Sequence, residues 1–283
     1  MRVCLFWNPT AGGGASLDTL TSAMTRAGHE VVRVVSRPEE LSIEHTQGVD
    51  CVAAAGGDGT VARAGRMLAG GSVPLAILPL GTANNIATSL GVDGQVDDVI
   101  ARWADRKIVR VDVGTLGGKC FLESVGCGLV TSCIEEGGRS LSKADPEEHL
   151  AAARQLYLDQ LKNRKPARYT ITMDDETVEG DYLLVEALNT AQVGPGIGLA
   201  SNVSSVDGLL SVVALGEEDR PALIDYITAL RDGESPAAPF HAWRTRHVEI
   251  RGTGHVHLDD LVISDASQPF SIDVKAGDLP IVG

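Results

Sequence analysis

Short apolar runs alternate with glycine-rich breaks and with stretches of helical spacing over the first hundred residues. This alternation of strand, loop and helix is typical of a sheet of parallel strands. Strands are predicted at residues 3–7, 31–35, 51–55 and 75–78. Helices are predicted from the end of the loop at residues 8–14 to about residue 27, over residues 61–68, and near residues 85–90 and 96–105. Residues 1–108 therefore predict a parallel α/β domain.

The pattern changes at residue 108, where apolar and polar positions alternate over residues 109–113 as on a half-buried strand. Later runs with strand character are expected near residues 121, 182–188, 209–215, 256–263 and 270–274. One helix is expected to interrupt them, since Asp145 can cap a helix and Pro146 suits its first turn. Residues 109–283 therefore predict a second domain that is mostly antiparallel β.

Composition narrows the class of protein. The chain has 43% apolar and 22% charged residues and a net charge of −14, which is ordinary for a globular protein but acidic. Few cations and few aromatic side chains argue against nucleic-acid binding. The five cysteines include no CxxC pair, so neither a disulfide framework nor a structural zinc site is expected. With no signal-like or membrane-spanning apolar run, we expect a cytoplasmic protein.

Glycine-containing breaks follow three of the predicted strands, at residues 12–14, 56–60 and 79–85. Ligands of open α/β sheets bind at the carboxyl ends of the strands, and glycine lets backbone N–H groups approach an anion closely. A single loop of this kind is usually only a tight turn. Three such loops, each opening a helix, indicate a phosphate site.

The phosphate site matches neither of two common types. The first lysine of the chain is Lys107, so a loop of the form GxxxxGK[ST] is absent from the first hundred residues. A dinucleotide site would have GxGxxG and an acidic residue after the second strand, whereas Ser36 and Arg37 stand there. Any anion in this half must be held without an ammonium group.

Three motifs carry a resemblance to a known family: NPTAGGG at residues 8–14, GGDGT at 56–60 and PLGTANN at 79–85. The chain resembles the diacylglycerol-kinase catalytic-domain family, which also contains sphingosine and ceramide kinases and bacterial lipid kinases. NAD kinases share GGDGT, but the PLGTANN segment favours the lipid-kinase branch. The resemblance continues through residues 189–209 and covers nearly the whole chain.

The resemblance implies an ATP-dependent, Mg²⁺-requiring kinase that phosphorylates a hydroxyl of a diacylglycerol or a sphingoid base. It implies a Rossmann-like first domain that holds ATP and a β-sandwich second domain that holds the lipid acceptor. NAD kinase activity and noncatalytic nucleotide binding remain alternatives. The basic run over residues 162–168 has two possible roles. It either complements the dipole at the C-terminal end of a helix or forms a patch for transient membrane contact. The oligomeric state stays open.

The nucleotide site that the resemblance implies has eleven members. They are Asn8, Pro9, Thr10, Gly12, Ser36, Gly57, Asp58, Gly59, Thr60, Thr82 and Asn84. Asp58 is expected to act through Mg²⁺, with a helix cap as its alternative role. A second metal position is implied at Asp207, with backbone carbonyls of Ser204 and Leu209. A hairpin turn is the alternative for that segment.

The expected catalytic base departs from the family pattern. Lipid kinases of this type carry Asp-Gly-Glu near the C-terminus, where the chain has Asp259, Asp260 and Leu261. Leucine cannot accept a proton. Asp259 is therefore the leading candidate for the base and Asp260 the second, unless the base is dispensable in a loose transition state. The change at Leu261 is also the reason to keep a nucleotide-binding protein without efficient kinase activity as an alternative.

Overall fold

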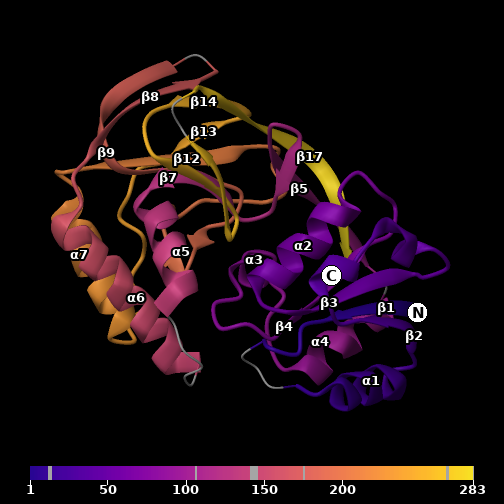
Figure 1. Ribbon diagram of the computed structural model, residues 1–283. Coiled ribbons are helices and arrows are strands. Elements are labelled where there is room, and N and C mark those ends of the chain that lie inside the picture. Colours follow the sequence, from indigo (N-terminus) through magenta and orange to yellow (C-terminus); the bar gives the residue numbers. More distant parts are fainter. Residues whose placement is uncertain (12–14, 106, 141–145, 175, 266–267, 283) are drawn as a thin grey trace.

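Two domains built on strands lie side by side in the computed structural model of the protein (Figure 1). The structure describes residues 1–11, 15–105, 107–140, 146–174, 176–265 and 268–282. The N-terminal domain carries parallel strands covered by helices, and the C-terminal domain carries mostly antiparallel strands. The fold class expected from the sequence is confirmed.

Four parallel strands form the centre of the N-terminal domain, in the order β2, β1, β3, β4. Their bounds are Arg2–Trp7 for β1, Glu30–Val35 for β2, Cys51–Gly56 for β3 and Leu75–Pro79 for β4. These ranges agree with the four predicted strands to within two residues. The loops after β3 and β4, with the glycines of residues 56–60 and 79–85, accordingly lie at the same edge of this sheet as residues 8–11 after β1.

Helices cover both faces of the parallel sheet because successive strand residues point to opposite sides. Helix α1 (Leu17–Arg26) and helix α4 (Val96–Arg102) pack on the face that carries Val3 and Leu5. Helix α2 (Asp58–Leu68) and helix α3 (Asn85–Ser89) lie on the other face, where Cys4 and Phe6 are buried. Short 3₁₀ turns at Pro38–Glu40, Ile43–Thr46 and Trp103–Asp105 complete this domain.

The C-terminal domain consists of antiparallel strands that enclose an apolar core. Its main strands are β6 (Lys119–Phe121), β7 (Ser124–Gly128), β8 (Ala167–Met173), β9 (Glu176–Leu188), β12 (Leu210–Gly216), β13 (Trp243–Thr245), β14 (His247–Arg251), β15 (His255–Leu258) and β16 (Leu261–Asp265). A separate ribbon pairs β10 (Gln192–Val193) with β11 (Ile197–Gly198). The single strand expected over residues 256–263 is instead the hairpin of β15 and β16, whose turn contains the two aspartates.

Three helices interrupt these strands, whereas one was expected. They are α5 (Leu129–Ser140), α6 (Pro146–Asn163) and α7 (Arg220–Arg231), and they pack together on one side of the sheet. The start of α5 is apolar and follows β7 directly, so its sequence looks like a continued strand. The predicted cap, Asp145, lies outside the described residues. None of the helices in the described part of the chain is long and apolar enough to cross a bilayer.

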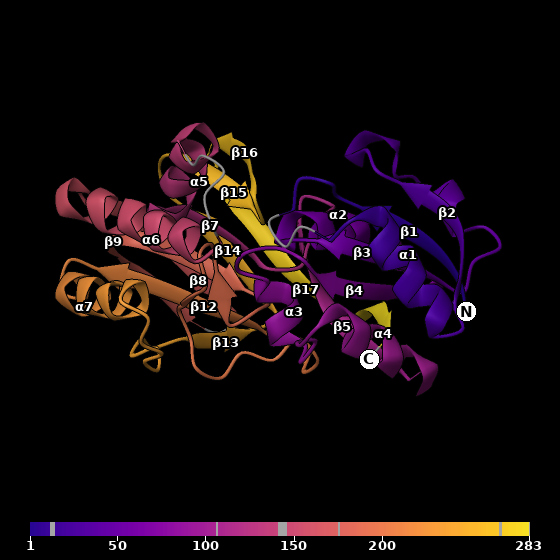
Figure 2. The same ribbon diagram turned by 90° about the horizontal axis from the view of Figure 1, so that it is seen from below.

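Two long strands connect the domains (Figure 2). Strand β5 (Ile108–Leu116) leaves the N-terminal domain, and β17 (Phe270–Val282) pairs with it in the antiparallel sense and returns. Ile281 pairs with Leu75 of β4 in the parallel sense. The last residues of the chain therefore extend the first sheet, although we expected the N-terminal domain to consist of residues 1–108. This pairing joins residues about two hundred positions apart, which local patterning does not reveal.

Replacing Ile281 by alanine tests how much the returning strand β17 contributes to the stability of the protein. Ile281 is 2% exposed within the core that includes α2, so we expect Ile281→Ala to lower the free energy of unfolding by about 2–5 kcal/mol. Ile43, which is 61% exposed, provides the matched control, and Ile43→Ala should change the same quantity by less than about 0.5 kcal/mol. Chemical denaturation measures the unfolding free energy of both variants. Equal losses would contradict a stabilising role of Ile281 in the core of the N-terminal domain.

Candidate active site

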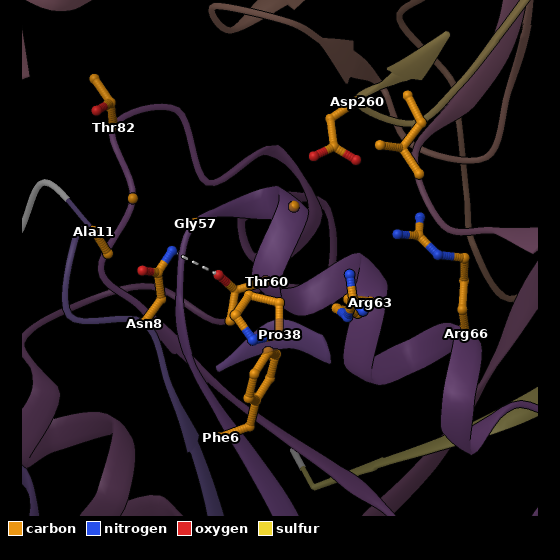
Figure 3. A pocket seen from close by; sticks show the side chains of 13 residues that line it. Phe6, Asn8, Ala11, Pro38, Gly57, Thr60, Arg63, Arg66, Thr82 and Asp260 are labelled. Atoms are coloured by element: carbon orange, nitrogen blue, oxygen red, sulfur yellow. Dashed lines mark hydrogen bonds between the residues drawn. The ribbon is translucent and has the colours of Figure 1, made fainter. Parts of the chain in front are cut away.

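A cavity of about 340 Å³ lies beyond the carboxyl ends of β1, β3 and β4, at the boundary with the C-terminal domain (Figure 3). We call it the glycine-loop cavity. Its walls come from the first loop, the GGDGT loop, helix α2, the loop after β4 and the turn between β15 and β16. The lining residues are Phe6, Asn8, Ala11, Pro38, Gly57, Gly59, Thr60, Arg63, Arg66, Gly81, Thr82, Asp260 and Leu261.

Two glycines let the loops after β3 and β4 lie backbone against backbone. A Cβ added at Gly81 would lie 2.3 Å from the Cα of Gly57, which no side chain tolerates. Asn84 stabilises this arrangement in a left-handed conformation with φ of 53°. Its Oδ1 accepts from the N–H of Gly81 at 2.9 Å, and its Nδ2 donates to the carbonyl of Gly81 at 2.8 Å. Asn84 therefore shapes the loop rather than lining the cavity.

The N-terminus of helix α2 opens into the glycine-loop cavity. Gly57 is its N-cap residue and provides no side-chain acceptor, while Gly59 and Thr60 of the first turn line the cavity. The first N–H groups of a helix have no partner within the helix, and the helix dipole is positive there. This end of the cavity is consequently suited to bind an anion.

The first loop contacts helix α2 through Asn8. Its Nδ2 donates to the hydroxyl of Thr60 at 3.3 Å, and its Oδ1 accepts from the N–H and the hydroxyl of Thr10 (Figure 3). Pro9 and Thr10 are exposed beside the cavity, and Ser36 is exposed at the end of β2. The structure thus brings together five of the eleven expected nucleotide residues as lining. Those five are Asn8, Gly57, Gly59, Thr60 and Thr82. Gly12 lies outside the described residues.

Asp58 faces helix α3 instead of the glycine-loop cavity. Its Oδ1 accepts from the N–H of Ile86 at 2.9 Å, in the first turn of that helix. Burial raises the pKa of the Asp58 carboxyl, and the surrounding backbone N–H groups lower it in part. Asp58 thus binds the first turn of α3 from outside that helix, and it does not line the glycine-loop cavity.

Three charged side chains in the described part of the chain line the glycine-loop cavity, namely Arg63, Arg66 and Asp260. Two are cationic, so the lining is net positive in a chain whose net charge is −14. Sequence reasoning missed both arginines. The available signal was helical spacing, because Thr60, Arg63 and Arg66 are three residues apart and share one face of α2.

Asp259, the leading candidate for the base, is buried and does not line the glycine-loop cavity. Its side chain is 2% exposed and receives an ion pair from Nη1 of Arg66 at 2.5 Å. It also accepts from the N–H groups of Leu122 and Glu123, at 3.1 and 2.8 Å. Burial raises the pKa of Asp259 to about 6, although the Arg66 guanidinium acts in the opposite direction. With its oxygens engaged, Asp259 is a structural anchor.

Asp260 is the aspartate that reaches the cavity. Its side chain is exposed there and has no hydrogen-bond or ion-pair partner among residues that the structure describes. A Cβ added at Gly59 would lie 2.5 Å from Oδ2 of Asp260, so the carboxylate sits directly over the start of α2. Leu261, which is 47% exposed, lines the rim. Of the two candidates for the base, Asp260 is the one whose carboxylate lines the glycine-loop cavity.

A second cavity of about 150 Å³ adjoins the first and shares Asp260 with it; we call it the small polar cavity. Glu123 is buried there, and its Oε1 accepts from Nδ2 of Asn85 and from the N–H of Gly194, both at 3.0 Å. Burial raises the pKa of Glu123 well above its ordinary value, and the charges of Asp58 and Asp259 raise it further. Glu123 therefore binds its proton more tightly in the folded protein than in the unfolded chain.

A third cavity of about 220 Å³ is mostly apolar and lies between helices α5 and α6; we call it the apolar cavity. It shares Thr82 with the glycine-loop cavity, and Ile134 and Gly194 with the small polar cavity. The other lining residues are Ala83, Cys133, Gly137, His149, Leu150, Ala153, Leu156, Tyr157 and Pro195. The three cavities are therefore neighbours, polar at one end and apolar at the other.

The expected metal set at Ser204, Asp207 and Leu209 forms a turn before β12. Oδ1 of Asp207 accepts from the N–H of Leu209 at 3.1 Å, and Oδ2 pairs with Arg244. Both carboxylate oxygens are thus engaged, and the segment is a turn but not a hairpin turn, because β12 pairs with β9 and β13. Within the described ranges, no group of three or more His, Cys, Asp or Glu side chains is placed to hold a metal ion.

The basic run at the end of α6 is largely paired within the chain. Lys162 contacts Asp159, and Arg168 pairs with Glu179. Arg164 is partly buried and donates to the carbonyl of Leu183 and the hydroxyl of Ser132. These contacts favour the structural role over a membrane-facing patch.

Comparisons with known proteins agree with this arrangement. Residues 2–116 match the diacylglycerol kinase catalytic domain, and residues 147–282 match the YegS C-terminal NAD kinase beta sandwich-like domain. A protein of Citrobacter koseri named "Probable lipid kinase YegS-like" is 32% identical over 202 residues, covering 69% of this chain and 67% of that protein. A diacylglycerol kinase of Mycobacterium tuberculosis is 25% identical over 296 residues, covering 97% and 92%.

Solved structures share the fold. A diacylglycerol kinase from Bacillus anthracis superimposes with a TM-score of 0.77 at 24% identity, over 99% of this chain and 96% of that one. The sequence matches show that the chain belongs to the diacylglycerol kinase catalytic-domain family. Its members are kinases, phosphotransferases that use an alcohol as acceptor, and the family implies ATP as the phosphoryl donor.

The buried acid in the small polar cavity predicts a pH dependence of stability. Glu123 ionises near pH 4.3 in the unfolded chain but only at higher pH in the folded protein. The stabilisation from its bound proton is complete below that unfolded pKa, and it is lost as pH rises towards the folded pKa. We expect Glu123→Gln to remove this loss, so that its unfolding free energy gains on that of the wild type as the pH is raised in measurements from about pH 5 to pH 8.

Guanidinium denaturation across this pH range measures the difference, with the exposed residue Glu39 changed to Gln as the control. A constant offset between the Glu123→Gln variant and the wild type at every pH would contradict a raised pKa of Glu123.

Proposed function

We propose that this protein is an ATP-dependent lipid kinase that transfers the γ-phosphoryl group to a hydroxyl of a diacylglycerol-type or sphingoid-type lipid. The observation that carries the proposal is the position of Asp260. Its unpartnered carboxylate lines both the glycine-loop cavity and the small polar cavity, which in turn adjoins the apolar cavity. Asp260 would thus supply a proton acceptor between a site for the phosphates and a site for the lipid.

ATP would occupy the glycine-loop cavity with its phosphates against Gly57, Gly59 and Thr60, where the N-terminus of α2 is positive. Thr82 would contact the phosphates from the loop after β4. The nucleoside would extend along the first loop, past Asn8, Pro9 and Thr10, towards Ser36 and Pro38. Backbone amides serve this role in a domain that lacks lysine before Lys107.

Mg²⁺ would enter with ATP and neutralise part of the phosphate charge. Neither Asp58 nor Asp207 presents a free carboxylate to such an ion, because hydrogen bonds and an ion pair engage both. The phosphoryl transfer described below therefore involves no metal ligand from the protein. The carboxylate at Asp260 remains available for the acceptor hydroxyl.

The lipid chain would lie in the apolar cavity between α5 and α6, with its hydroxyl directed towards the small polar cavity. Relatives named lipid kinase and diacylglycerol kinase support an acceptor of this class. In the reaction, the acceptor oxygen forms a bond to the γ-phosphorus while the bond between that phosphorus and the ADP oxygen breaks. Asp260 accepts the hydroxyl proton, and phosphoryl transfer otherwise needs positioning more than covalent help.

Asp260→Asn tests this assignment. Since asparagine cannot accept the proton, we expect transfer of radiolabelled phosphate from ATP to a total lipid extract to fall by about 10²- to 10⁴-fold. ATP binding measured by calorimetry should stay within about twofold. Asp105→Asn, on an exposed 3₁₀ turn of the N-terminal domain, is the matched control and should leave transfer unchanged.

Three outcomes separate the alternatives. Unimpaired transfer by the Asp260→Asn variant would remove Asp260 as the base. Wild-type protein that binds ATP but labels neither lipid nor NAD would indicate a nucleotide-binding family member without kinase activity. Labelling of NAD rather than lipid would indicate an NAD kinase.

A further inference from the structure

Two arginines of helix α2 have no role in the function described so far. Arg63 is exposed at the glycine-loop cavity and has no hydrogen-bond or ion-pair partner in the described part of the molecule. Arg66 is 20% exposed and lies one turn further along the helix. Figure 3 shows both side chains on the side of α2 that carries Thr60, with Asp260 across the cavity from them.

Arg66 is held from one side only. Its Nη1 contacts Oδ2 of Asp259, and the Asp259 carboxylate is itself bound by the backbone of Leu122 and Glu123. The guanidinium group is planar with five N–H donors in a fixed fork, so one anchored nitrogen orients the others. Among the described residues, the remaining donors of Arg66 have no partner, and the side chain lines the cavity. A buried anion therefore positions a cation whose free donors are available to a ligand.

The chemistry of the cavity identifies the ligand that these donors suit. During phosphoryl transfer, negative charge spreads over the three equatorial oxygens of the transferred group. Donors that are fixed in advance stabilise such charge more effectively than mobile ones. Arginine matches phosphate oxygens in a bidentate geometry. The first hundred residues have no lysine, and no group of three or more His, Cys, Asp or Glu side chains among the described residues is placed to hold a metal ion.

We propose that Arg63 and Arg66 form the subsite for the γ-phosphoryl group, and that Asp259 is the positioning residue that orients Arg66. This inference rests on the proposed kinase function for the identity of the nucleotide. Arg63 and Arg66 contact the group that is transferred, whereas the amides at the start of α2 hold the phosphates that remain in ADP. Asp259 acts through Arg66 and exchanges no proton with the acceptor.

The subsite predicts a difference between ATP and ADP that does not depend on turnover. Calorimetry with Mg²⁺ present should show that Arg63→Met and Arg66→Met each weaken ATP binding by about tenfold while changing ADP binding by less than twofold. Arg66→Lys should keep part of the ATP preference, because it retains the charge but loses the fork. Arg26→Met is the matched control, since Arg26 is exposed on α1 and pairs only with Asp97 in the described structure.

Kinetics test the role of Asp259. Removing one fixed donor to a transition state lowers kcat by about 10²- to 10³-fold, which is the loss expected for Arg66→Met. Asp259→Asn should lower kcat by about tenfold with little change in KM for the lipid. The double variant should be no slower than Arg66→Met alone, because Asp259 acts through that residue. Thermal melting checks that each variant is folded. If the Arg66→Met variant does not fold, the Arg66→Lys variant is used for the same kinetic test.

Unchanged ATP preference in both methionine variants would overturn the subsite. Additive losses in the double variant would overturn the positioning role of Asp259. If the wild type labels no lipid while its preference for ATP over ADP still depends on Arg63 and Arg66, the kinase proposal fails and the γ-phosphate subsite stands. The two proposals are thus tested separately.

Discussion

The ion pair between Arg66 and Asp259 joins helix α2 of the N-terminal domain to the turn between β15 and β16 of the C-terminal domain. Asp259 is buried, and its backbone is also fixed, with φ of 51° and its N–H bound to the carbonyl of Ser124. A buried carboxylate without its partner would be strongly destabilising, so the pair maintains the contact between the two domains. The next residue, Asp260, is consequently held over the glycine loop.

Burial divides the carboxylates of this acidic chain into groups with different behaviour. Glu123 and Asp58 lie in the interior, where desolvation raises the pKa of each, and hydrogen bonds commit them to Asn85, Gly194 and helix α3. Asp260 remains exposed to the cavity without a partner among the described residues. The net charge of −14 therefore says little about the local potential at the glycine-loop cavity, where two arginines face one carboxylate.

Local signals predicted the N-terminal domain well because its strands are short apolar runs and its loops contain glycine. The GGDGT and PLGTANN segments pointed to an anion site, and five of the residues expected there line the cavity. Local signals were weaker in the C-terminal domain. Helix α5 begins with an apolar run that also suits a strand, and helix α7 was missed despite buried residues at Leu223, Tyr226, Ile227 and Leu230. The hairpin turn at Asp259 and Asp260 was expected as continuous strand.

The sequence alone determined the fold class, the family and the glycine-containing loops after β3 and β4, because these depend on short-range periodicity and on glycines at fixed spacing. Only the tertiary structure decided which carboxylate is free. Asp259 and Asp260 are adjacent in the chain, yet the first meets Arg66, Leu122 and Glu123 while the second meets the cavity. Their difference arises from contacts with residues more than one hundred positions away, and local pattern carries no record of such contacts.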